Sequence, residues 1–248
     1  MATRNKKKAA RRILVVDVGG SHVKFRVGNG KEQRFVSGPK LSAATMVKKI
    51  HKLIDRSEYD VVSIGYPGLV FRGRIAAEPF NLGRGWVGFD FEAGLGRPVR
   101  LINDAAMQAV GSYTGGRMLF LGFGTGMGAT LILDGIVEPM EIGHLPYKHG
   151  RTFEGYVGQR GLQRCGKKKW RKIVAEVVGQ LSRAFEVDYV VLGGGNAQLL
   201  KELPTGARLG DNRNAMVGGR IIWEMDNPLH LDPKYRVRPE YRVRPETR

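Results

Sequence analysis

Two glycine-rich turns are the first features of the sequence whose residue types suggest chemistry. One is Asp17-Val-Gly-Gly-Ser21, and the other, about 105 residues later, is Gly122-Phe-Gly-Thr-Gly-Met-Gly128. Backbone amides at such turns converge into concavities that bind phosphate oxygens, and glycine lets a ligand approach closely. Tight hairpins also use glycine for steric reasons alone, so either turn taken singly is weak evidence. The pair, with an acidic residue at the head of the first, favours a phosphate clamp between two lobes.

The elements that must position these turns follow from the spacing of apolar residues. β-Branched runs predict buried strands over 13–18, 60–65, 99–102 and 189–192, and strands over 21–27 and 33–36 joined by Gly28-Asn-Gly30. A second β block over 117–123 and 129–133 flanks the second turn. Helical spacing predicts helices over 42–56, with Ser42 as N-cap, and over 105–113, 168–185 and 197–203, whereas 67–97 reads as an irregular loop region. Each turn therefore belongs to its own β block.

The basic residues are concentrated in three segments of the chain. The 248 residues carry 41 Lys plus Arg against 23 Asp plus Glu, a net charge of +18. Segments 1–12, 164–172 and 234–248 each hold six basic residues, and the rest of the chain is nearly neutral. This pattern indicates either a polyanionic partner or basic appendages that keep the protein soluble. No helix-turn-helix, finger or other nucleic-acid signature accompanies the charge, so we expect no specific nucleic acid as partner.

Composition restricts the class of protein further. A hydrophobic fraction of 42% fits a globular chain, and no apolar run approaches the roughly 18 residues of a membrane span, so we expect no membrane partner. The N-terminus lacks the apolar segment of a secretory signal, and the single Cys165 permits no internal disulfide. We therefore expect a cytoplasmic protein. The repeated YRVRPE near the C-terminus is expected to be extended and mobile.

Seven short motifs in order give the sequence a family resemblance. They are DVGGS (17–21), IGYPGLV (64–70), PFNLGRGW (79–86), LINDA (101–105), GFGTGMG (122–128), EIGH (141–144) and LGGG (192–195). Their order resembles the ROK family of sugar kinases over residues 13–195. The resemblance implies an α/β, two-lobed actin/hexokinase-like fold, ribonuclease H-like in each lobe, with a central cleft. We expect a basic N-terminal extension (1–12), an N-terminal lobe (13–103), a C-terminal lobe (104–233) and a basic tail (234–248).

Asp104 is the residue that the resemblance marks as general base. A sugar hydroxyl is a poor nucleophile, and phosphoryl transfer to it profits from a carboxylate that accepts its proton. Asp104 follows a predicted strand and begins a predicted helix, so its position alone favours an ordinary N-cap. Similar Asp residues in the family contact the 6-hydroxyl of glucose, and this resemblance reverses the preference.

The remaining site residues are also carried by the resemblance. The sugar-binding set comprises Asn81, Asn103, Asp104, Glu141, His144 and, with less support from the pattern, Glu154. The phosphoryl-donor set comprises Asp17, Gly19, Gly20, Ser21, Lys24, Gly124, Thr125, Gly126, Gly193, Gly194, Lys167, Lys168 and Lys169. Asp17 resembles the carboxylate that holds Mg²⁺, usually through water, and a hard cation suits a carboxylate ligand.

One departure from the family pattern bears on the phosphoryl donor. Many members carry one His and three Cys as zinc ligands near the sugar site, whereas this chain has Cys165 alone, so we expect no structural zinc. The zinc-less pattern and Gly19-Gly-Ser-x-x-Lys24 are similar to the polyphosphate-dependent glucokinase branch. In that interpretation Lys24 and segment 164–172 face a linear polyphosphate, which binds lysine and arginine much as a nucleic-acid backbone does. The lysines of KKKWRK fit a solvated helix start equally well.

The leading hypothesis from the sequence is a glucokinase that uses polyphosphate, ATP or both, with Mg²⁺ as cofactor. An ATP-only ROK hexokinase acting on glucose or another sugar is the alternative enzyme. A sugar-sensing regulator or a nucleic-acid-binding protein is the non-enzymatic alternative, although only 12 residues precede the first predicted strand. Related proteins are commonly dimers, and a homodimer stays open at this stage.

Overall fold

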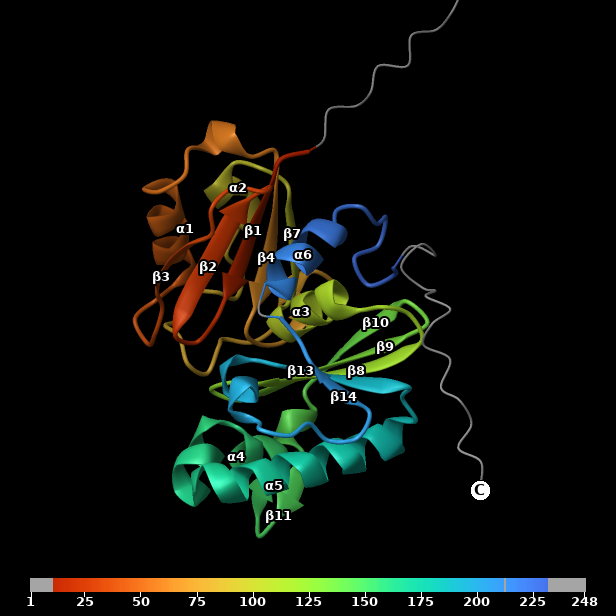
Figure 1. Cartoon of the computed structure of the whole chain (residues 1–248). Coiled ribbons are helices and arrows are strands. Elements are labelled where there is room, and N and C mark those ends of the chain that lie inside the picture. Colours follow the sequence, from red (N-terminus) through yellow and green to blue (C-terminus); the bar gives the residue numbers. More distant parts are fainter. Residues whose placement is uncertain (1–10, 212, 232–248) are drawn as a thin grey trace, which may run out of the picture.

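The computed structural model describes residues 11–211 and 213–231, which form two lobes around similar sheets (Figure 1). The first sheet has the order β3-β2-β1-β4-β7. Its strands are β1 (Ile13–Val18), β2 (His22–Val27), β3 (Gln33–Val36), β4 (Val61–Tyr66) and β7 (Val99–Asn103). Strands β1 to β3 are antiparallel neighbours, while β4 lies parallel to β1 and β7 parallel to β4. Because helices cover both faces, β4 is buried along its whole length, as its β-branched sequence predicts.

The second sheet repeats this arrangement in the C-terminal half. Its order is β10-β9-β8-β13-β14, with the same sequence of antiparallel and parallel pairs. The strands are β8 (Arg117–Phe123), β9 (Met127–Leu133), β10 (Ile136–Met140), β13 (Tyr189–Gly193) and β14 (Ala207–Leu209). The expected two-lobed α/β architecture is therefore present, and each glycine-rich turn joins the first two strands of one sheet.

Two helices lie between the sheets, α3 (Asp104–Ser112) and α6 (Asn214–Ile221) (Figure 1). They pack so closely that a Cβ on Gly218 would overlap the backbone of Met107, and one on Gly111 would overlap the backbone of Asn214. Only glycine permits this approach of two helix backbones. Helix α6, from the end of the chain, also packs on β1 and β4, so residues of both halves share one hydrophobic cluster.

The outer faces of the sheets are covered by the other helices. On the N-terminal lobe these are α1 (Ala43–His51) and α2 (Phe91–Leu95), which enclose Trp86 and Ile50 against the sheet. On the C-terminal lobe they are α4 (Phe153–Val157) and α5 (Gln159–Phe185), which bury Trp170. The short elements are β5 (Val70–Phe71), β6 (Arg74–Ile75), β11 (Pro146–Lys148), β12 (Arg151–Thr152) and three 3₁₀ turns, η1 (Arg56–Glu58), η2 (Ile142–His144) and η3 (Gly195–Leu199).

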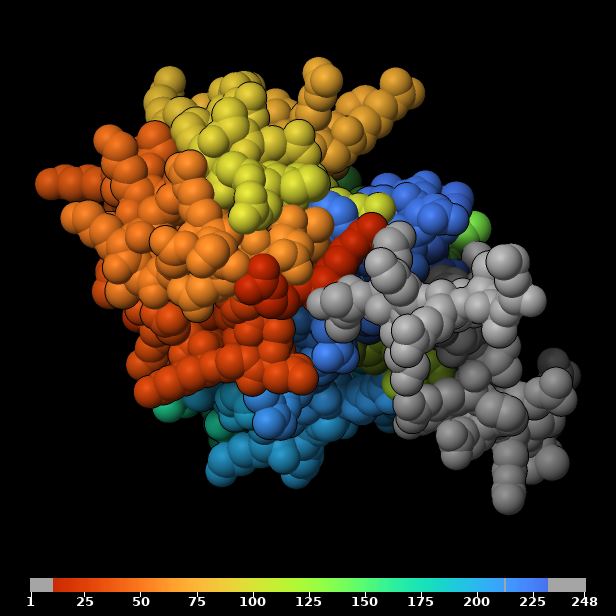
Figure 2. Space-filling model, turned by 90° about the horizontal axis from the view of Figure 1, so that it is seen from above, coloured from red at the N-terminus to blue at the C-terminus, as the bar shows by residue number. Residues whose placement is uncertain are grey.

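The segment after α6 ties the two lobes together. Arg100 of β7 donates to the carbonyls of Ile222 and Met225, at 2.6 Å for Met225, and its guanidinium lies over the Trp223 ring. Further on, the amide of Leu231 donates to the Gly135 carbonyl beside β10. Figure 2 shows this blue segment flanking the red and orange surface of the N-terminal lobe.

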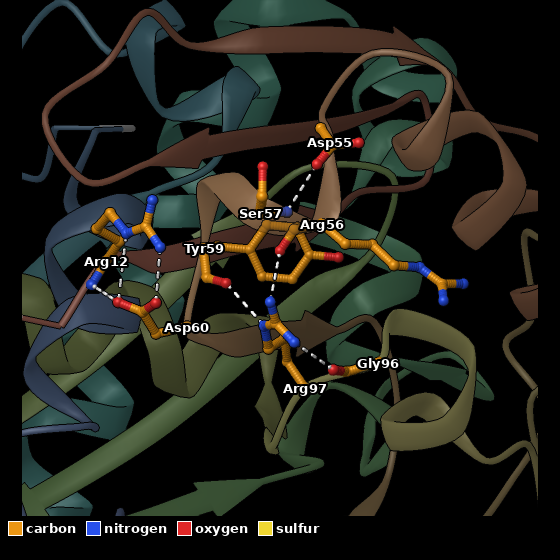
Figure 3. A network of polar contacts seen from close by, with 8 residues as sticks. All are labelled: Arg12, Asp55, Arg56, Ser57, Tyr59, Asp60, Gly96 and Arg97. Carbon is orange, nitrogen blue, oxygen red and sulfur yellow. Dashed lines mark hydrogen bonds and ion pairs between the residues drawn. The ribbon is translucent and has the colours of Figure 1, made fainter.

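A polar network fixes the end of the first sheet that lies away from the turns (Figure 3). Arg12, just before β1, forms an ion pair with Asp60, just before β4, at 2.9 Å. Arg97, before β7, donates to the carbonyls of Tyr59 and Arg56 at 2.9 and 3.0 Å. These contacts align the amino ends of three parallel strands, so their carboxyl ends also share one edge.

Several predicted boundaries are wrong, each for a local reason. The helix expected over 42–56 ends at His51, because Asp55 caps the 3₁₀ turn η1 with a capping box. The loop region 67–97 contains β5, β6 and α2, and the helix expected over 197–203 is only η3. The helix expected from 168 begins at Gln159, with a break at Gly166 (φ 72°).

Helix α6 was not predicted at all. It contains Gly218 and Gly219, which lower helix propensity and hide its period, and it forms because it packs between the sheets. No helix within the described ranges is long and apolar enough to cross a membrane. Most of the predicted N-terminal extension and all of the 234–248 tail, including the YRVRPE repeat, lie outside the described residues.

Candidate active site

A cleft of about 690 Å³ lies where the two glycine-rich turns meet between the lobes. It brings together most of the residues that the sequence predicted. Those that line it are Asp17, Gly19, Gly20, Ser21, Lys24, Asn81, Asn103, Asp104, Gly124, Thr125, Gly126, Glu141, His144, Glu154 and Gly194. The whole predicted sugar set and most of the predicted donor set therefore line one continuous space.

The two turns face each other across the cleft. A Cβ on Gly20 would lie 3.2 Å from Thr125 Oγ1, which shows how closely the lobes approach here. Asn196 holds the second turn by donating from Nδ2 to the Gly124 carbonyl at 3.1 Å. Gly194 (φ 78°) passes so close to the Phe123 backbone that no side chain fits. Glycine is required at this last position both by its conformation and by the lack of space.

Asp17 and Asp104 place two carboxylates on the N-terminal side of the cleft. Asp17 lies near the end of β1, opposite Lys24 on β2, and Asp104 directly follows β7. Burial raises the pKa of Asp17 to about 6, although the Lys24 charge opposes the rise. Burial also raises the pKa of Asp104 to about 8, and the negative charge of Asp17 adds to it. Both carboxylates are therefore protonated more readily than a solvated Asp.

Asp104 is not the N-cap of its helix. That role falls to Asn103, whose Oδ1 accepts from the Ala106 amide at 3.1 Å while its Nδ2 donates to the Gly68 carbonyl at 3.1 Å. Asp104 occupies the first helical position, and its Oδ1 accepts from the Ala105 amide at 2.8 Å. Asn103 therefore fills the N-cap role that the sequence position suggested for Asp104, and Asp104 lines the cleft.

His144 lies between two glutamates of the C-terminal lobe that also line the cleft. Its Nδ1 lies 3.7 Å from Glu141 Oε2, and its Nε2 lies 3.9 Å from Glu154 Oε2. Glu154 also accepts from the Met127 amide at 3.2 Å, which fixes it to the second turn. Partial burial raises the pKa of Glu141, and His144 opposes that rise. These alternating donors and acceptors suit a ligand that carries several hydroxyl groups.

Four residues of the predicted donor set lie outside the cleft lining. Gly193 belongs to β13, where a side chain would overlap the ring of Phe120. The three lysines Lys167, Lys168 and Lys169 directly follow the break at Gly166 in α5, and all are exposed. Lys169 lines a separate pocket of about 440 Å³, together with Arg151, Tyr156, Arg164, Cys165 and Ile173.

Sequence reasoning missed several residues that line the cleft, notably Phe80, Gln108, Gln159 and Asn196. Phe80 stands beside Asn81 in the PFNLGRGW motif, so the motif itself was the available signal. The other three are single amides on helices and turns, and nothing in the local sequence sets them apart.

Comparison with known proteins identifies the class. The ROK family model matches residues 13–170. A polyphosphate glucokinase of Mycobacterium tuberculosis (strain CDC 1551 / Oshkosh) is 25% identical, over 73% of this chain and 76% of the relative. A kanosamine kinase of Amycolatopsis mediterranei (strain S699) is 31% identical, over 69% of this chain and 61% of the relative. The solved inorganic polyphosphate/ATP-glucomannokinase of Arthrobacter sp. strain KM superposes with a TM-score of 0.71 at 23% identity, covering 86% of this chain and 98% of that one.

These findings define a sugar kinase with the actin/hexokinase-like fold. Within that class, the chain belongs to the ROK family. The resemblance inferred from seven short motifs is confirmed, as is the fold class that it implied.

Proposed function

We propose that this protein transfers a phosphoryl group from inorganic polyphosphate or ATP to the 6-hydroxyl of glucose. The observation that carries the proposal is the place of Asp104 in the cleft, which it shares with the two glycine-rich turns and with the cluster of Glu141, His144 and Glu154. Phosphoryl transfer needs a donor and an acceptor in one water-poor space with a base beside the acceptor.

In the proposed reaction Asp104 accepts the proton of the sugar hydroxyl. The hydroxyl oxygen forms a bond to the terminal phosphorus of the donor, and the bond from that phosphorus to the bridging oxygen breaks. The shortened donor leaves with the bridging electron pair. A base works best when its pKa lies near the operating pH, and burial raises the pKa of Asp104 to about 8. Asn81, Asn103, Glu141, His144 and Glu154 would hold the other hydroxyls.

The donor is assigned to the glycine-rich turns and their surroundings. Gly19, Gly20, Ser21, Gly124, Thr125 and Gly126 present backbone to the cleft, and Lys24 supplies a positive charge. The relatives named polyphosphate glucokinase favour polyphosphate as donor. Gly194 and the first residues of η3 also line the cleft, and this part of the lining would equally suit a nucleotide.

Magnesium fits the carboxylate side of the cleft. Asp17 would hold it, mainly through water. Lys24 is the one cation of the described residues that opposes the raised pKa of Asp17, and none opposes that of Asp104, so a cation would offset the charge of both carboxylates. Within residues 11–211 and 213–231 no three His, Cys, Asp or Glu side chains are grouped for metal binding, so one carboxylate and the phosphates would share the ion. When bound, magnesium neutralises charge on the phosphates.

A parallel assay with two donors tests the proposal. Purified protein is incubated with glucose, Mg²⁺ and either polyphosphate or ATP, at low and high salt, and glucose 6-phosphate is measured. We expect product with polyphosphate and a rise in its KM at high salt. Product with ATP alone would replace the proposal with an ATP-dependent hexokinase. No product from glucose with either donor would overturn glucose as the acceptor, and kanosamine would then be the next sugar to assay because of the relative named for it.

A further inference from the structure

Phe80 has an unusual environment for a large apolar side chain. It is 88% exposed, the most of any large hydrophobic residue described, and yet it lines the cleft. The apolar residues near it in the chain do not share this exposure, since Pro79 is buried and Leu82 is buried at 7%, whereas the polar Asn81 is exposed. Because the ring lies largely in water, folding gains little from its burial, and its place in the cleft lining points instead to contact with a ligand.

The ring of Phe80 lies against His144 across the cleft. Their ring centroids are 5.6 Å apart and the rings meet edge to face at 75°. Phe80 comes from the loop between β6 and α2 of the N-terminal lobe, and His144 comes from η2 of the C-terminal lobe. The contact therefore spans the two lobes and fixes the Phe80 ring beside the Glu141, His144 and Glu154 cluster.

Pyranose rings have two kinds of surface. Their hydroxyls point outward and need polar partners, while the axial C–H groups form an apolar face that is covered well by an aromatic ring. The cluster around His144 supplies the polar partners. Phe80 is the aromatic side chain beside that cluster in the cleft lining, with Leu69 as a further apolar neighbour in the lining.

We propose that Phe80 is the apolar wall of the acceptor site and that its ring covers the C–H face of a pyranose held by Glu141, His144 and Glu154. This inference rests on the proposed function, because it assigns a contact for the proposed acceptor sugar. Phe80 is a specificity-determining residue in this account: it favours a closed sugar ring over an open-chain polyol with the same hydroxyls.

The chain offers a matched control for this proposal. Phe71 of β5 is also exposed, at 61%, but it does not line the cleft. Substituting either residue with Ala removes the same side chain from an exposed position. Neither change should lower the melting temperature, because neither ring is in the core.

The experiment measures glucose binding by calorimetry without donor, and then KM and kcat with each donor, for wild type, Phe80→Ala, Phe80→Trp and Phe71→Ala. We expect Phe80→Ala to raise the Kd and KM for glucose about tenfold with the donor KM unchanged. Phe80→Trp should stay within about twofold of wild type because it keeps an aromatic face, and Phe71→Ala should not differ from wild type.

Three results would overturn the inference, and they are distinguishable. If wild type binds glucose and Phe80→Ala binds it equally well, the proposed contact is absent while the proposed function stands. If wild type shows no glucose binding at all, the proposed acceptor falls and the contact falls with it. A fall in donor affinity as large as that in glucose affinity would instead mean that Phe80 acts on the whole cleft, which also contradicts an acceptor wall.

Discussion

The two lobes have the same strand order but bring different chemistry to the cleft. In the first sheet, Asp17 of β1 pairs with Gly65 at the end of parallel β4. In the second sheet, Gly122 of β8 pairs with Gly193 at the end of parallel β13. The two positions correspond, and one carries a buried carboxylate where the other carries no side chain.

The same contrast extends beyond this pair of positions. The N-terminal lobe also contributes Asp104 after its last strand, whereas the turn of the C-terminal lobe contributes Gly124 and Gly126. Carboxylates can accept a proton and attract a cation, and bare backbone can approach phosphate closely. In the proposed function, this asymmetry at the carboxyl ends of matching strands would place the base and the metal-holding carboxylate on the N-terminal side, while the second turn would offer bare backbone to the donor phosphates.

The largest effect is expected from removing the base on the carboxylate side. Asp104→Asn keeps the size of the side chain but leaves nothing to accept the hydroxyl proton, so kcat should fall by about 10²- to 10⁴-fold. Asp90→Asn, at the exposed N-cap of α2, is the matched control and should retain activity, because Asn caps helices as well as Asp does. Steady-state kinetics of both variants checks this, and an Asp104→Asn enzyme of nearly full activity would remove the proposed base.

The burial of the two carboxylates predicts an unusual dependence of stability on pH. The folded-state pKa values of Asp17 and Asp104, about 6 and about 8, are higher than that of an Asp in the unfolded chain. Their contribution is therefore complete below about pH 4 and is lost as pH rises through these values. In metal-free buffer, Asp104→Asn should be more stable than wild type at pH 9, by on the order of a few kcal/mol, and similar to it near pH 4.

Urea unfolding of both proteins between pH 4 and pH 9 measures this difference. Subtracting the unfolding free energy of wild type from that of the variant cancels the contributions of groups that both proteins share. One such group is Asp60, whose pKa is lowered by Arg12 and whose contribution to stability changes with pH in the opposite direction. A difference that stays constant with pH would contradict the raised pKa of Asp104.

The glycine side of the cleft is tested by Gly124→Ala. A Cβ at Gly124 meets no atom within 4 Å, so the variant should fold normally. The added methyl group projects where the donor is expected, and the donor KM should rise about tenfold while the glucose KM stays unchanged. Steady-state kinetics with each substrate varied in turn separates the two KM values. An unchanged donor KM would mean that phosphate does not approach the backbone of Gly124.

The smallest effect is expected at the three lysines outside the cleft. Changing Lys167, Lys168 and Lys169 together to Gln should raise the polyphosphate KM about threefold at low salt, more than the ATP KM, and the difference should vanish at high salt. The Lys48→Gln, Lys52→Gln pair on the opposite lobe, exposed on and just after α1, controls for lost charge. Equal losses with both donors would argue against a basic track for polyphosphate.

Sequence reasoning was accurate where signals are local. The β-branched run at Ile13–Val18 and the glycines at 122–128 define strands and turns through residues adjacent in the chain, and the structure has them there. It failed where tertiary contacts override propensity, as in α6, whose glycines disfavour a helix in isolation but allow it to pack on α3. The lysines of segment 164–172 show the same limit, because the break at Gly166 and the path of α5 decide what they face.

The sequence by itself determined the family, the two turns and the residue types of the cleft, because a motif is read from neighbours along the chain. Only the tertiary structure decided which of those residues share a space. It made Asn103 rather than Asp104 the helix cap, it brought Asp17 close enough to Asp104 to raise its pKa, and it set Phe80 against His144. Each of these relations joins residues through space, and burial and charge act over distances that the order of residues does not record.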